Sequence, residues 1–570
     1  MIQMYKNNTK FIIRKRNIFF VTCILLFIFL SCTEEKKKTD TKNQQKEKKE
    51  LSLKEKINQY VLIELKPNLN NLSKKELKAL YYLIEAAEAI DEIFWKQTCC
   101  LKDTLFQRLK TKEESIYVAI NYGPWDRLKD NEPFIEGIGK KPIGAGFFPP
   151  DIKYFPFLSL KAEDKISQYT VIKKDEFGDL YTLPYHKEYA EELSIASNSL
   201  LKAAEYIDNI ELKRFLRKRA ESLLNDDYYT SDLLWMELEP DKCKIDIVIG
   251  PVNTEDDCFL NTKTTYEAYI LLCYPELTKK YNNFSKLLNE MIKEIPLPEN
   301  YINKIVVGKS KIGVYDGIYF SGWPNAGAKQ ISINYPKDIR IKIEKGHKKL
   351  MFKNIMEAKF YNVLLPLAKT LLQLDSTISL KFEAFFINGI AYEFADATIV
   401  KETVNKKGPA KEALKDYYPV INSLKSDFLY IFLITKLHEK GLVKETSLKE
   451  HYYTYVANLL RSIRFGSVVN QGSSSLIAFN MLRKFKAIEL TENGKYFISV
   501  ERMKEVINKL TKDVFKLLAE GDIPTAKQWL QIYGSFSEEI YEKMDLLSKN
   551  NIPVDIRYKQ GKEVLNLQLQ

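Results

Sequence analysis

The spacing of apolar residues predicts α-helices over most of the chain. In LSKKELKALYYLIEAAEAIDEIFWKQ (72–97) apolar side chains recur every three or four positions, and the same spacing returns over 185–226. Such spacing puts the apolar side chains on one face of a helix. From Lys345 to about Lys549 the helical pattern dominates, over 350–373, 380–399, 426–440, 451–463, 472–486 and 501–519. The second half of the chain is therefore predicted to be mostly helical.

Several stretches break the helical pattern. Residues 120–152 are rich in glycine and proline, which are typical of turns. KIDIVIGPV (244–252) is a β-branched run that suits a strand, and 314–338 mix aromatic and alternating segments that suit strands and turns. IPVDIRYKQG (552–561) has the pattern of a closing strand.

Helical and irregular segments alternate along the chain, so we expect lobes that are not sequential. The predicted fold class is α+β, predominantly α, with two lobes flanking a wide cleft. Residues 57–265 form the expected lower lobe of mixed helix and strand, to which 318–345 and 550–570 return. Residues 266–317 and 346–549 form the expected helical upper lobe. A cleft between lobes is the expected ligand site.

The positive charge of the chain is concentrated near its N-terminus. The 570 residues carry a formal charge of +12. Residues 1–17 contribute five Lys/Arg and no acid, and 33–56 contribute nine Lys against six Asp/Glu, which leaves about +4 for the rest. So small an excess does not indicate a phosphate-binding surface, and no nucleic-acid partner is predicted.

The N-terminal segment has the features of a secretion signal. Lys10, Arg14, Lys15 and Arg16 precede an apolar run over 18–30 that is short for a membrane span. The run ends in Ser31-Cys32, so the segment resembles a bacterial lipoprotein signal peptide (1–31) with Cys32 as the lipidated residue. An uncleaved anchor is the alternative. Both place the body outside the cytoplasm, at a bacterial membrane on its periplasmic face or at the cell surface.

A charged tract follows the signal. Residues 32–56 contain no apolar residue between Cys32 and Leu51. Such a tract cannot bury enough surface to offset chain entropy, so a disordered tether is predicted.

The cysteines and common motifs indicate no catalytic site. Apart from Cys23 and Cys32 the chain has five cysteines, an odd number, and their spacing matches neither a zinc ribbon nor a disulfide scaffold, so core positions are expected for most of Cys99, Cys100, Cys243, Cys258 and Cys273. GIGKKPIG lacks the first glycine and the Ser/Thr of a phosphate loop, and GSSS lacks the G-x-S-x-G nucleophile pattern.

The histidines form no recognisable metal motif. Beyond the signal the chain has His186, His347, His438 and His451, each isolated in sequence. KLHEKG has Leu442 where an HExxH motif requires its second histidine. We therefore expect these histidines to be surface or hydrogen-bonded residues.

One helical segment has part of a metallopeptidase pattern. FEAFFINGIAYEFADATI (382–399) has an apolar face and carries Glu393. A zinc metallopeptidase helix carries two histidines at i and i+4, with a glutamate after the first as general base. Here the glutamate is present and both histidines are absent.

The chain resembles one family over almost its whole length after the tether. From about residue 75 to 558, several stretches are similar, in order, to bacterial members of the dipeptidyl-peptidase III family of zinc metallopeptidases: INYGPWDRLKDNEPFIEGIGKKPIGAGFFP, DDYYTSDLLWMEL, KIDIVIGPV, NAGAKQISIN, KFEAFF, ITKLHEKG and RSIRFGS. The resemblance implies an upper helical lobe carrying zinc, a lower lobe with a small β-barrel, and a wide peptide-binding cleft.

The resemblance also places the family's zinc ligands on this sequence. The first histidine falls on Tyr392 and the second on Asp396, or on Ala397 with the longer HExxxH spacing. The paired glutamates of a later helix fall on Asn422 and Ser423. A further family histidine, which assists the transition state from the cleft wall, falls near Gln471, a candidate substrate-binding residue.

These positions favour a protein that has kept the family's fold without its chemistry. Glu393 is the one retained catalytic position, and Tyr392, Asp396 and Ser423 are not an ordinary zinc ligand set. We therefore predict a lipid-anchored pseudopeptidase with no cofactor, which binds peptides or a protein partner in its cleft. The alternatives are an active zinc peptidase that releases dipeptides from peptide N-termini, and a structural component of an envelope complex.

Overall fold

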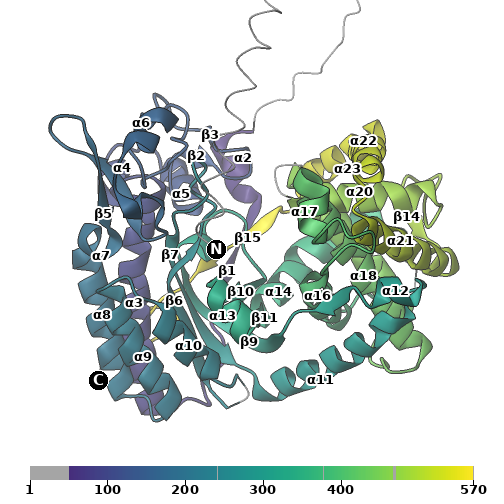
Figure 1. Cartoon of the computed structure of the whole chain (residues 1–570), viewed down its shortest axis with the longest axis horizontal. Helices are drawn as coiled ribbons and strands as arrows, with labels where there is room; N and C mark the ends of the chain where they lie inside the picture. The colour runs from purple at the N-terminus through teal and green to yellow at the C-terminus, as the bar shows by residue number, and fades with distance from the viewer. Residues whose placement is uncertain (1–50, 241, 376–377, 467–469, 569–570) are drawn as a thin grey trace, which may run out of the picture. The chain divides into compact units, whose positions relative to one another are not determined.

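Two hydrophobic cores organise the part of the chain that the structure describes. The structure is a computed structural model that describes residues 51–240, 242–375, 378–466 and 470–568. One core gathers residues between Leu65 and Val363 together with Ile556, and the other gathers residues between Tyr281 and Leu547 (Figure 1). The predicted signal peptide and Cys32 lie outside the described residues.

The first core is a mixed lobe of helices packed on a sheet. Its helices include α3 (Lys74–Thr98), α8 (Ala190–Glu205), α9 (Ile210–Leu223) and α10 (Tyr229–Glu237). Its sheet has five strands in the order β10 (Ser332–Tyr335), β11 (His347–Phe352), β9 (Ser310–Ser321), β7 (Thr265–Cys273) and β6 (Ile245–Asn253). Every residue of β7 is buried, because β7 lies in the interior of the sheet and α3 packs against it.

Smaller elements complete this lobe. The helices are α2 (Leu53–Asn58), α4 (Lys102–Phe106), α5 (Lys112–Asn121), α6 (Tyr154–Ser159), α7 (Tyr185–Glu188) and α13 (Ile339–Glu344). The strands are β2 (Trp125–Asp126), β3 (Glu132–Pro133), β4 (Thr170–Lys174) and β5 (Leu180–Pro184). The predicted closing strand is confirmed: β15 (Asp555–Lys559) pairs in parallel with β1 (Tyr60–Glu64).

The second core is helical. Its elements are α11 (Pro275–Met291), α12 (Glu299–Ile302), α14 (Lys353–Lys359), a π-helical turn (Phe360–Leu364), α15 (Leu365–Leu371), α16 (Phe382–Ala397), α17 (Ala410–Leu414), α18 (Tyr418–Glu439), α19 (Leu448–Ile463), α20 (Asn470–Lys484), α21 (Val500–Glu520), α22 (Ile523–Tyr533) and α23 (Glu538–Lys549). This lobe also has two short antiparallel strand pairs, β8 (Ile305–Val307) with β12 (Thr398–Val400) and β13 (Ile488–Leu490) with β14 (Tyr496–Ile498). α18 packs against α16, α20 and α21, so it is the central helix of this lobe.

Local sequence signals set the ends of several helices. α3 and α19 begin with capping boxes, in which Ser73 pairs with Glu76 and Ser447 with Glu450. α21 ends at Gly521, whose positive φ of 56° suits glycine. These signals explain why the helical periodicity read from the sequence gives helices at the expected places.

Three predictions of organisation differ from the structure. The described strands form no closed barrel, because the edge strands β10 and β6 do not pair, so the small barrel is not confirmed. β7 and most of β9 fall within 266–317, assigned above to the helical lobe, yet they pair in the sheet of the first lobe. α2, capped by Ser52 and Glu55, begins inside the expected tether of 32–56 because its capping box can form locally.

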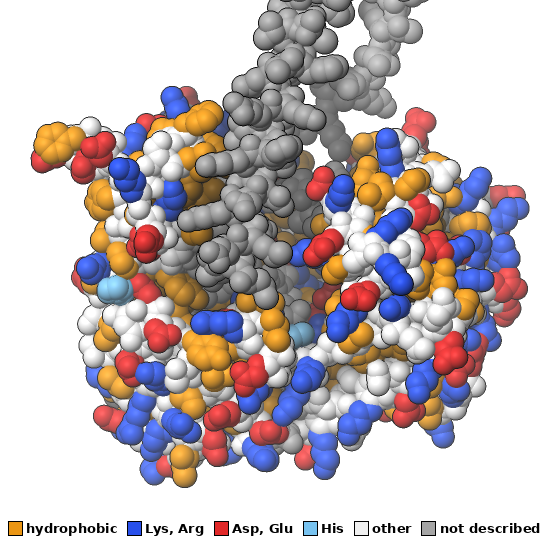
Figure 2. All heavy atoms as spheres, viewed as in Figure 1, with side chains coloured by type: hydrophobic (Ala, Val, Ile, Leu, Met, Phe, Trp, Pro, Cys, Tyr) orange, Lys and Arg blue, Asp and Glu red, His pale blue; other side chains and the backbone are white. Residues whose placement is uncertain are grey.

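The surface agrees with an ordinary charge distribution. Figure 2 shows Lys/Arg and Asp/Glu side chains interspersed over the face in view. No helix within the described ranges is long and apolar enough to cross a membrane. Cys243 and Cys273 are buried as predicted, Cys99 and Cys100 are half-buried, and Cys258 is exposed because it lies in a loop after β6.

A buried ion pair ties β15 to the second core. Both oxygens of Asp555 lie near Lys359 Nζ, at 2.9 and 3.0 Å, and the two side chains are only 1% and 4% exposed. The Asp555 carboxylate also accepts hydrogen bonds from the backbone amides of Lys329 and Ile556, each at 2.8 Å.

Removing one member of this pair should therefore be costly. We expect Asp555→Ala to lower the free energy of unfolding by about 3–5 kcal/mol, because it leaves the buried Lys359 ammonium without its counter-charge and two backbone amides without their acceptor. Urea denaturation followed by circular dichroism measures the change. Asp545→Ala, which breaks the exposed pair of Asp545 with Lys549 in α23, is the control and should leave the midpoint almost unchanged. Equal effects of the two substitutions would contradict the role of the buried pair.

Candidate functional site

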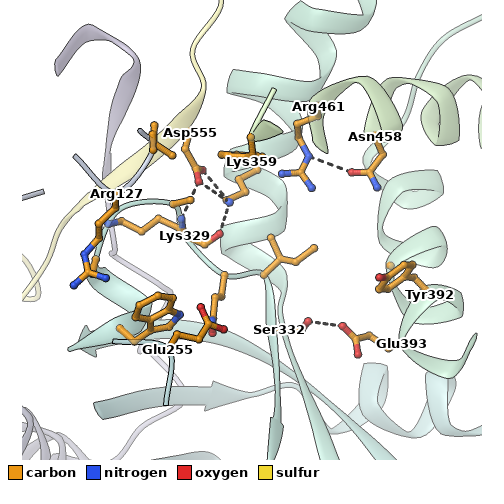
Figure 3. Close-up of a pocket in the computed structure, with 18 of the residues that line it drawn as sticks. Arg127, Glu255, Lys329, Ser332, Lys359, Tyr392, Glu393, Asn458, Arg461 and Asp555 are labelled. Carbon is orange, nitrogen blue, oxygen red and sulfur yellow. Dashed lines mark hydrogen bonds and ion pairs between the residues drawn. The ribbon is translucent and has the colours of Figure 1, made fainter. Parts of the chain in front are cut away.

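A cavity of about 800 Å³ lies between the two cores. The sheet lobe contributes Lys329, Gln330, Ile331 and Ser332, and the helical lobe contributes Phe385, Tyr392, Glu393, Tyr430, Asn458 and Arg461 (Figure 3). A volume of this size accommodates a ligand of a few hundred daltons. The cavity is therefore the expected cleft between the lobes.

Strand β10 borders the cavity and is an edge of the sheet. Among the described residues β10 is hydrogen-bonded to one neighbour, β11, in antiparallel register. Ile331 and Ser332 line the cavity where this strand begins. An unpaired strand edge offers backbone N–H and C=O groups to an extended chain.

Helix α16 positions the residues that the sequence singled out. Its apolar side chains, among them Phe385, Ile390 and Phe394, are buried in the helical core. Tyr392 and Glu393 line the large cavity, and together with Asp396 they also line a second cavity of about 240 Å³. The apolar periodicity thus turns these polar residues toward the cavities.

Glu393 bridges the two lobes. Its Oε1 accepts a hydrogen bond from Ser332 Oγ of β10 at 2.5 Å, and its Oε2 lies 2.9 Å from Lys349 Nζ of β11. The Lys349 side chain is 1% exposed and that of Glu393 is 12% exposed. Burial alone would raise the pKa of Glu393, but the Lys349 ammonium and the Ser332 hydroxyl hold it below its ordinary value. We call this contact the Glu393 bridge.

A second lysine closes the C-terminal end of α16. Lys425 of α18 is buried, and its Nζ donates to the carbonyl oxygens of Ala395 at 2.7 Å and Thr398 at 2.6 Å. A cation at a helix C-terminus interacts favourably with the helix dipole. Burial lowers the pKa of Lys425 to about 8, and the nearby Asp396 carboxylate opposes this change.

The remaining expected ligand positions lie on α18. Asn422 and Ser423 are half-buried on the helix that packs against α16. One turn further along α18, Asp427 is buried and accepts a hydrogen bond from Ser474 at 2.9 Å, and burial raises its pKa to about 7. The Tyr430 ring lies edge-on to that of Tyr392, with 5.8 Å between ring centroids.

The structure gives less information on two predicted residues. Gln471 falls in α20, but its side chain lies outside the described residues. Ser423 lines neither of the two cavities described here. Tyr392, Glu393 and Asp396 are the predicted residues that the structure brings together at one place.

The histidines make separate contacts. His186 Nδ1 lies 2.7 Å from Asp226, and His451 is buried between Asn388 and Thr446 at 2.6 and 2.7 Å. The His438 ring lies edge-on to that of His451, with ring centroids 5.1 Å apart. His347 lies on β11, where burial and the neighbouring Lys349 lower its pKa to about 4. Within the described ranges no group of three or more His, Cys, Asp or Glu side chains is placed to hold a metal ion.

Sequence reasoning missed the residues that set the charge of the site. Lys349, Lys425 and Ser332 carry no motif, and their partners lie far away in the sequence. The one available signal is a lysine inside an apolar segment, as in HKKLMF for Lys349 and INSLKSDFLY for Lys425. Such lysines need a buried partner, which the sequence does not identify.

Comparison with known proteins finds solved structures and a plant protein that are similar to this chain. No family model matches the sequence. The solved structure of DPP III from Caldithrix abyssi is 32% identical, with a TM-score of 0.84, and the match covers 90% of this chain and 100% of that chain. Dipeptidyl-peptidase III from Corallococcus sp. strain EGB is 29% identical with a TM-score of 0.77, covering 90% and 98%. The Arabidopsis thaliana protein Nudix hydrolase 3 is 27% identical over 576 residues, 90% of this chain and 74% of that protein.

The Glu393 bridge predicts a large energetic coupling between its two charged residues. Lys349→Met should lower the free energy of unfolding by about 3–5 kcal/mol, because the Glu393 carboxylate stays buried without its cation. Lys349→Met combined with Glu393→Gln should recover much of that loss. A double-mutant cycle in urea at pH 7 measures the coupling. Additive effects of the single substitutions would contradict the bridge.

The same variants should differ in how stability depends on pH. In the wild type the folded pKa of Glu393 is below its unfolded value, so its stabilisation is present above about pH 4.3 and is lost as the pH falls. In Lys349→Met burial raises that pKa, so stability is instead lost as the pH rises above about 4.3. Denaturation midpoints between about pH 3 and 8 distinguish the two trends.

Proposed function

The chain belongs to the dipeptidyl-peptidase III family, and we propose that it is a lipid-anchored pseudopeptidase that binds peptides in its cleft without hydrolysing them. The observation that carries the proposal is the Glu393 bridge. A catalytic glutamate has to deprotonate a water molecule activated by zinc. Here both oxygens of the one retained family carboxylate are already bound by Ser332 and Lys349.

The residues at the family's ligand positions do not fit a zinc ion. Zinc prefers imidazole, thiolate and carboxylate ligands. Burial raises the pKa of Tyr392 well above its ordinary value, so its phenol stays protonated, and Ser423 offers only a hydroxyl. Asp396 is the one ordinary zinc donor among these positions, and a single carboxylate does not make a catalytic zinc site.

The local charges support the same interpretation. Lys349 neutralises Glu393, and the buried Lys425 ammonium interacts with Asp396. The two lysines therefore compensate the negative charge of carboxylates that would otherwise attract a metal ion. A divalent cation placed among these ammonium groups would be repelled by both of them.

Peptide binding is supported by the strand edge and the cavity beside it. An extended peptide can add to β10 through main-chain hydrogen bonds, a mode that requires no metal. Ile331 and Ser332 lie at the cavity, so a peptide paired with β10 would run along it. A folded partner protein could present an extended segment in the same way.

The proposed location follows from the N-terminal sequence. The basic residues, the short apolar run and Cys32 resemble a lipoprotein signal, and the charged tract after Cys32 would link the anchor to the body. Cys32 and the tract through Glu50 lie outside the described residues, so this part of the proposal depends on sequence alone. The activities in the names of the related proteins, including the hydrolase activity in the plant protein's name, are properties of those proteins.

Metal content and peptide binding test the proposal directly. The purified chain should contain no stoichiometric zinc and should bind short peptides with Kd values of roughly micromolar to millimolar, as a few main-chain hydrogen bonds allow. It should release no dipeptide, with or without added zinc. Elemental analysis, calorimetry and a dipeptide-release assay measure these properties. Zinc-dependent release would instead favour the active peptidase, and no binding to any peptide would favour a structural role.

Restoring the family residues provides a positive control. Tyr392→His, Asp396→His and Ser423→Glu together should recover zinc binding before turnover, because Gln471 still replaces the family histidine. Tyr392→His with Asp396→His alone lacks the third ligand and should bind zinc more weakly.

The anchor has a separate test. Cys32→Ala should block processing and leave a species heavier than the mature protein by the length of the signal peptide. Metabolic labelling with a radioactive fatty acid, followed by electrophoresis, detects the lipid. Label that is still incorporated into Cys32→Ala would contradict the assignment, and the matched variant Cys23→Ala should be labelled like the wild type.

A further inference from the structure

Arg461 offers unused hydrogen-bond donors to the cavity. It lies in the last turn of α19, and its Nε donates to Asn458 Oδ1 at 3.1 Å. Its two terminal nitrogens have no hydrogen-bond or ion-pair partner among the described residues. Figure 3 shows the guanidinium directed into the cavity from the helical lobe.

The surroundings of Arg461 are rich in positive charge. The Asp555 carboxylate interacts electrostatically with Arg461, but its oxygens are bound by Lys359 Nζ and by the backbone amides of Lys329 and Ile556. The Lys329 ammonium donates to backbone carbonyls, including that of Gly327 at 3.2 Å. Three cationic side chains therefore surround one carboxylate that is already fully bound.

Burial is the largest cause of the pKa shifts in this corner. Burial and the neighbouring Lys359 ammonium together lower the pKa of Lys329 to about 7, against the attraction of Asp555. Burial also lowers the pKa of Arg461, against the attraction of Asp555. An added anion would stabilise all of these cations.

Several other charged residues of the cavity have a partner of opposite charge, which Arg461 lacks among the described residues. Arg127 also lines the cavity, and it forms a two-point ion pair with Asp256 at 3.2 and 3.3 Å. Lys141 binds the same carboxylate, and Glu393 is bound by Lys349. Of the two arginines lining the described cavity, only Arg461 has no carboxylate partner.

We propose that Arg461 binds a carboxylate of the peptide in the cleft, either the C-terminal carboxylate or that of an aspartate or glutamate side chain. The inference depends on the proposed peptide-binding function. Arginine presents two parallel N–H donors that match the two oxygens of a carboxylate. The bond from Nε to Asn458 fixes the guanidinium plane, so less side-chain entropy is lost when the ligand binds.

Synthetic tetrapeptides can separate the two carboxylate sources. Tetra-alanine with a free carboxyl group should bind the full-length chain about ten- to hundredfold more tightly than tetra-alanine amide, as calorimetry measures. A comparison of the affinities of Ala-Ala-Glu-Ala amide and Ala-Ala-Gln-Ala amide shows whether a side-chain carboxylate also binds. The proposal is supported if either acidic peptide binds more tightly than its neutral counterpart and this difference depends on Arg461.

Substitutions identify the residue responsible. Arg461→Gln should remove the preference for the free acid and leave binding of the amide unchanged, and Arg461→Lys should keep part of the preference. Arg217→Gln removes an exposed arginine of α9 and is the matched control for charge, with no change expected. Thermal unfolding should show that Arg461→Gln stays folded, because it removes a cation that has no carboxylate partner.

Each alternative result has a distinct meaning. Equal binding of acid and amide by the wild type would overturn this inference while leaving the proposed peptide binding intact. No binding of any tetrapeptide would overturn both. Inorganic phosphate that binds in an Arg461-dependent way, without any preference among the peptides, would assign the residue to a phosphate ligand and overturn the carboxylate proposal.

Discussion

A buried carboxylate between two lobes requires a cation, and in this protein the cation is an ammonium group of the chain itself. Glu393 projects from the helical lobe, whereas Lys349 and Ser332 belong to neighbouring strands of the sheet. Leaving such a carboxylate unpaired would cost several kcal/mol. The position of α16 relative to β10 and β11 is therefore tied to this contact, and so is the cavity that these elements line.

Buried lysines also account for the electrostatics at the C-terminal end of α16. Lys425 is bonded to the last carbonyls of α16 and interacts with Asp396, so the end of this helix has its own positive charge. A metal-binding helix needs excess negative charge or neutral imidazoles pointing at one place. Here the negative charge of α16 is compensated by Lys349 and Lys425, which belong to the chain itself.

Much of the fold could be predicted from the sequence because helix periodicity is a local property. α16, α18, α19 and α21 lie where the apolar spacing predicted them, and β15 is the closing strand. The lobe boundary near 265 was harder to predict, because β7 is buried along its whole length and its sequence lacks the regular alternation that distinguishes a strand from a helix. The barrel was expected from resemblance alone, and the described strands form an open sheet.

The site was only partly predictable, for a different reason. Glu393 stands in a helix with a recognisable pattern, whereas the residues that determine its behaviour are single lysines and a serine on other elements. Helices α20 to α23 separate Arg461 from Asp555 in the sequence, yet both residues line one cavity. Pairing of buried charges is a tertiary property, so a sequence shows which residues are charged but not which of them lack a partner. Arg461 and Arg127 illustrate this difference. Each has the hydrogen-bond donors for a carboxylate, but only Arg127 has a carboxylate partner within the described chain. A cation kept at a cavity wall without a counter-charge weakens the unliganded fold, and that cost is offset only when an anion enters the cavity.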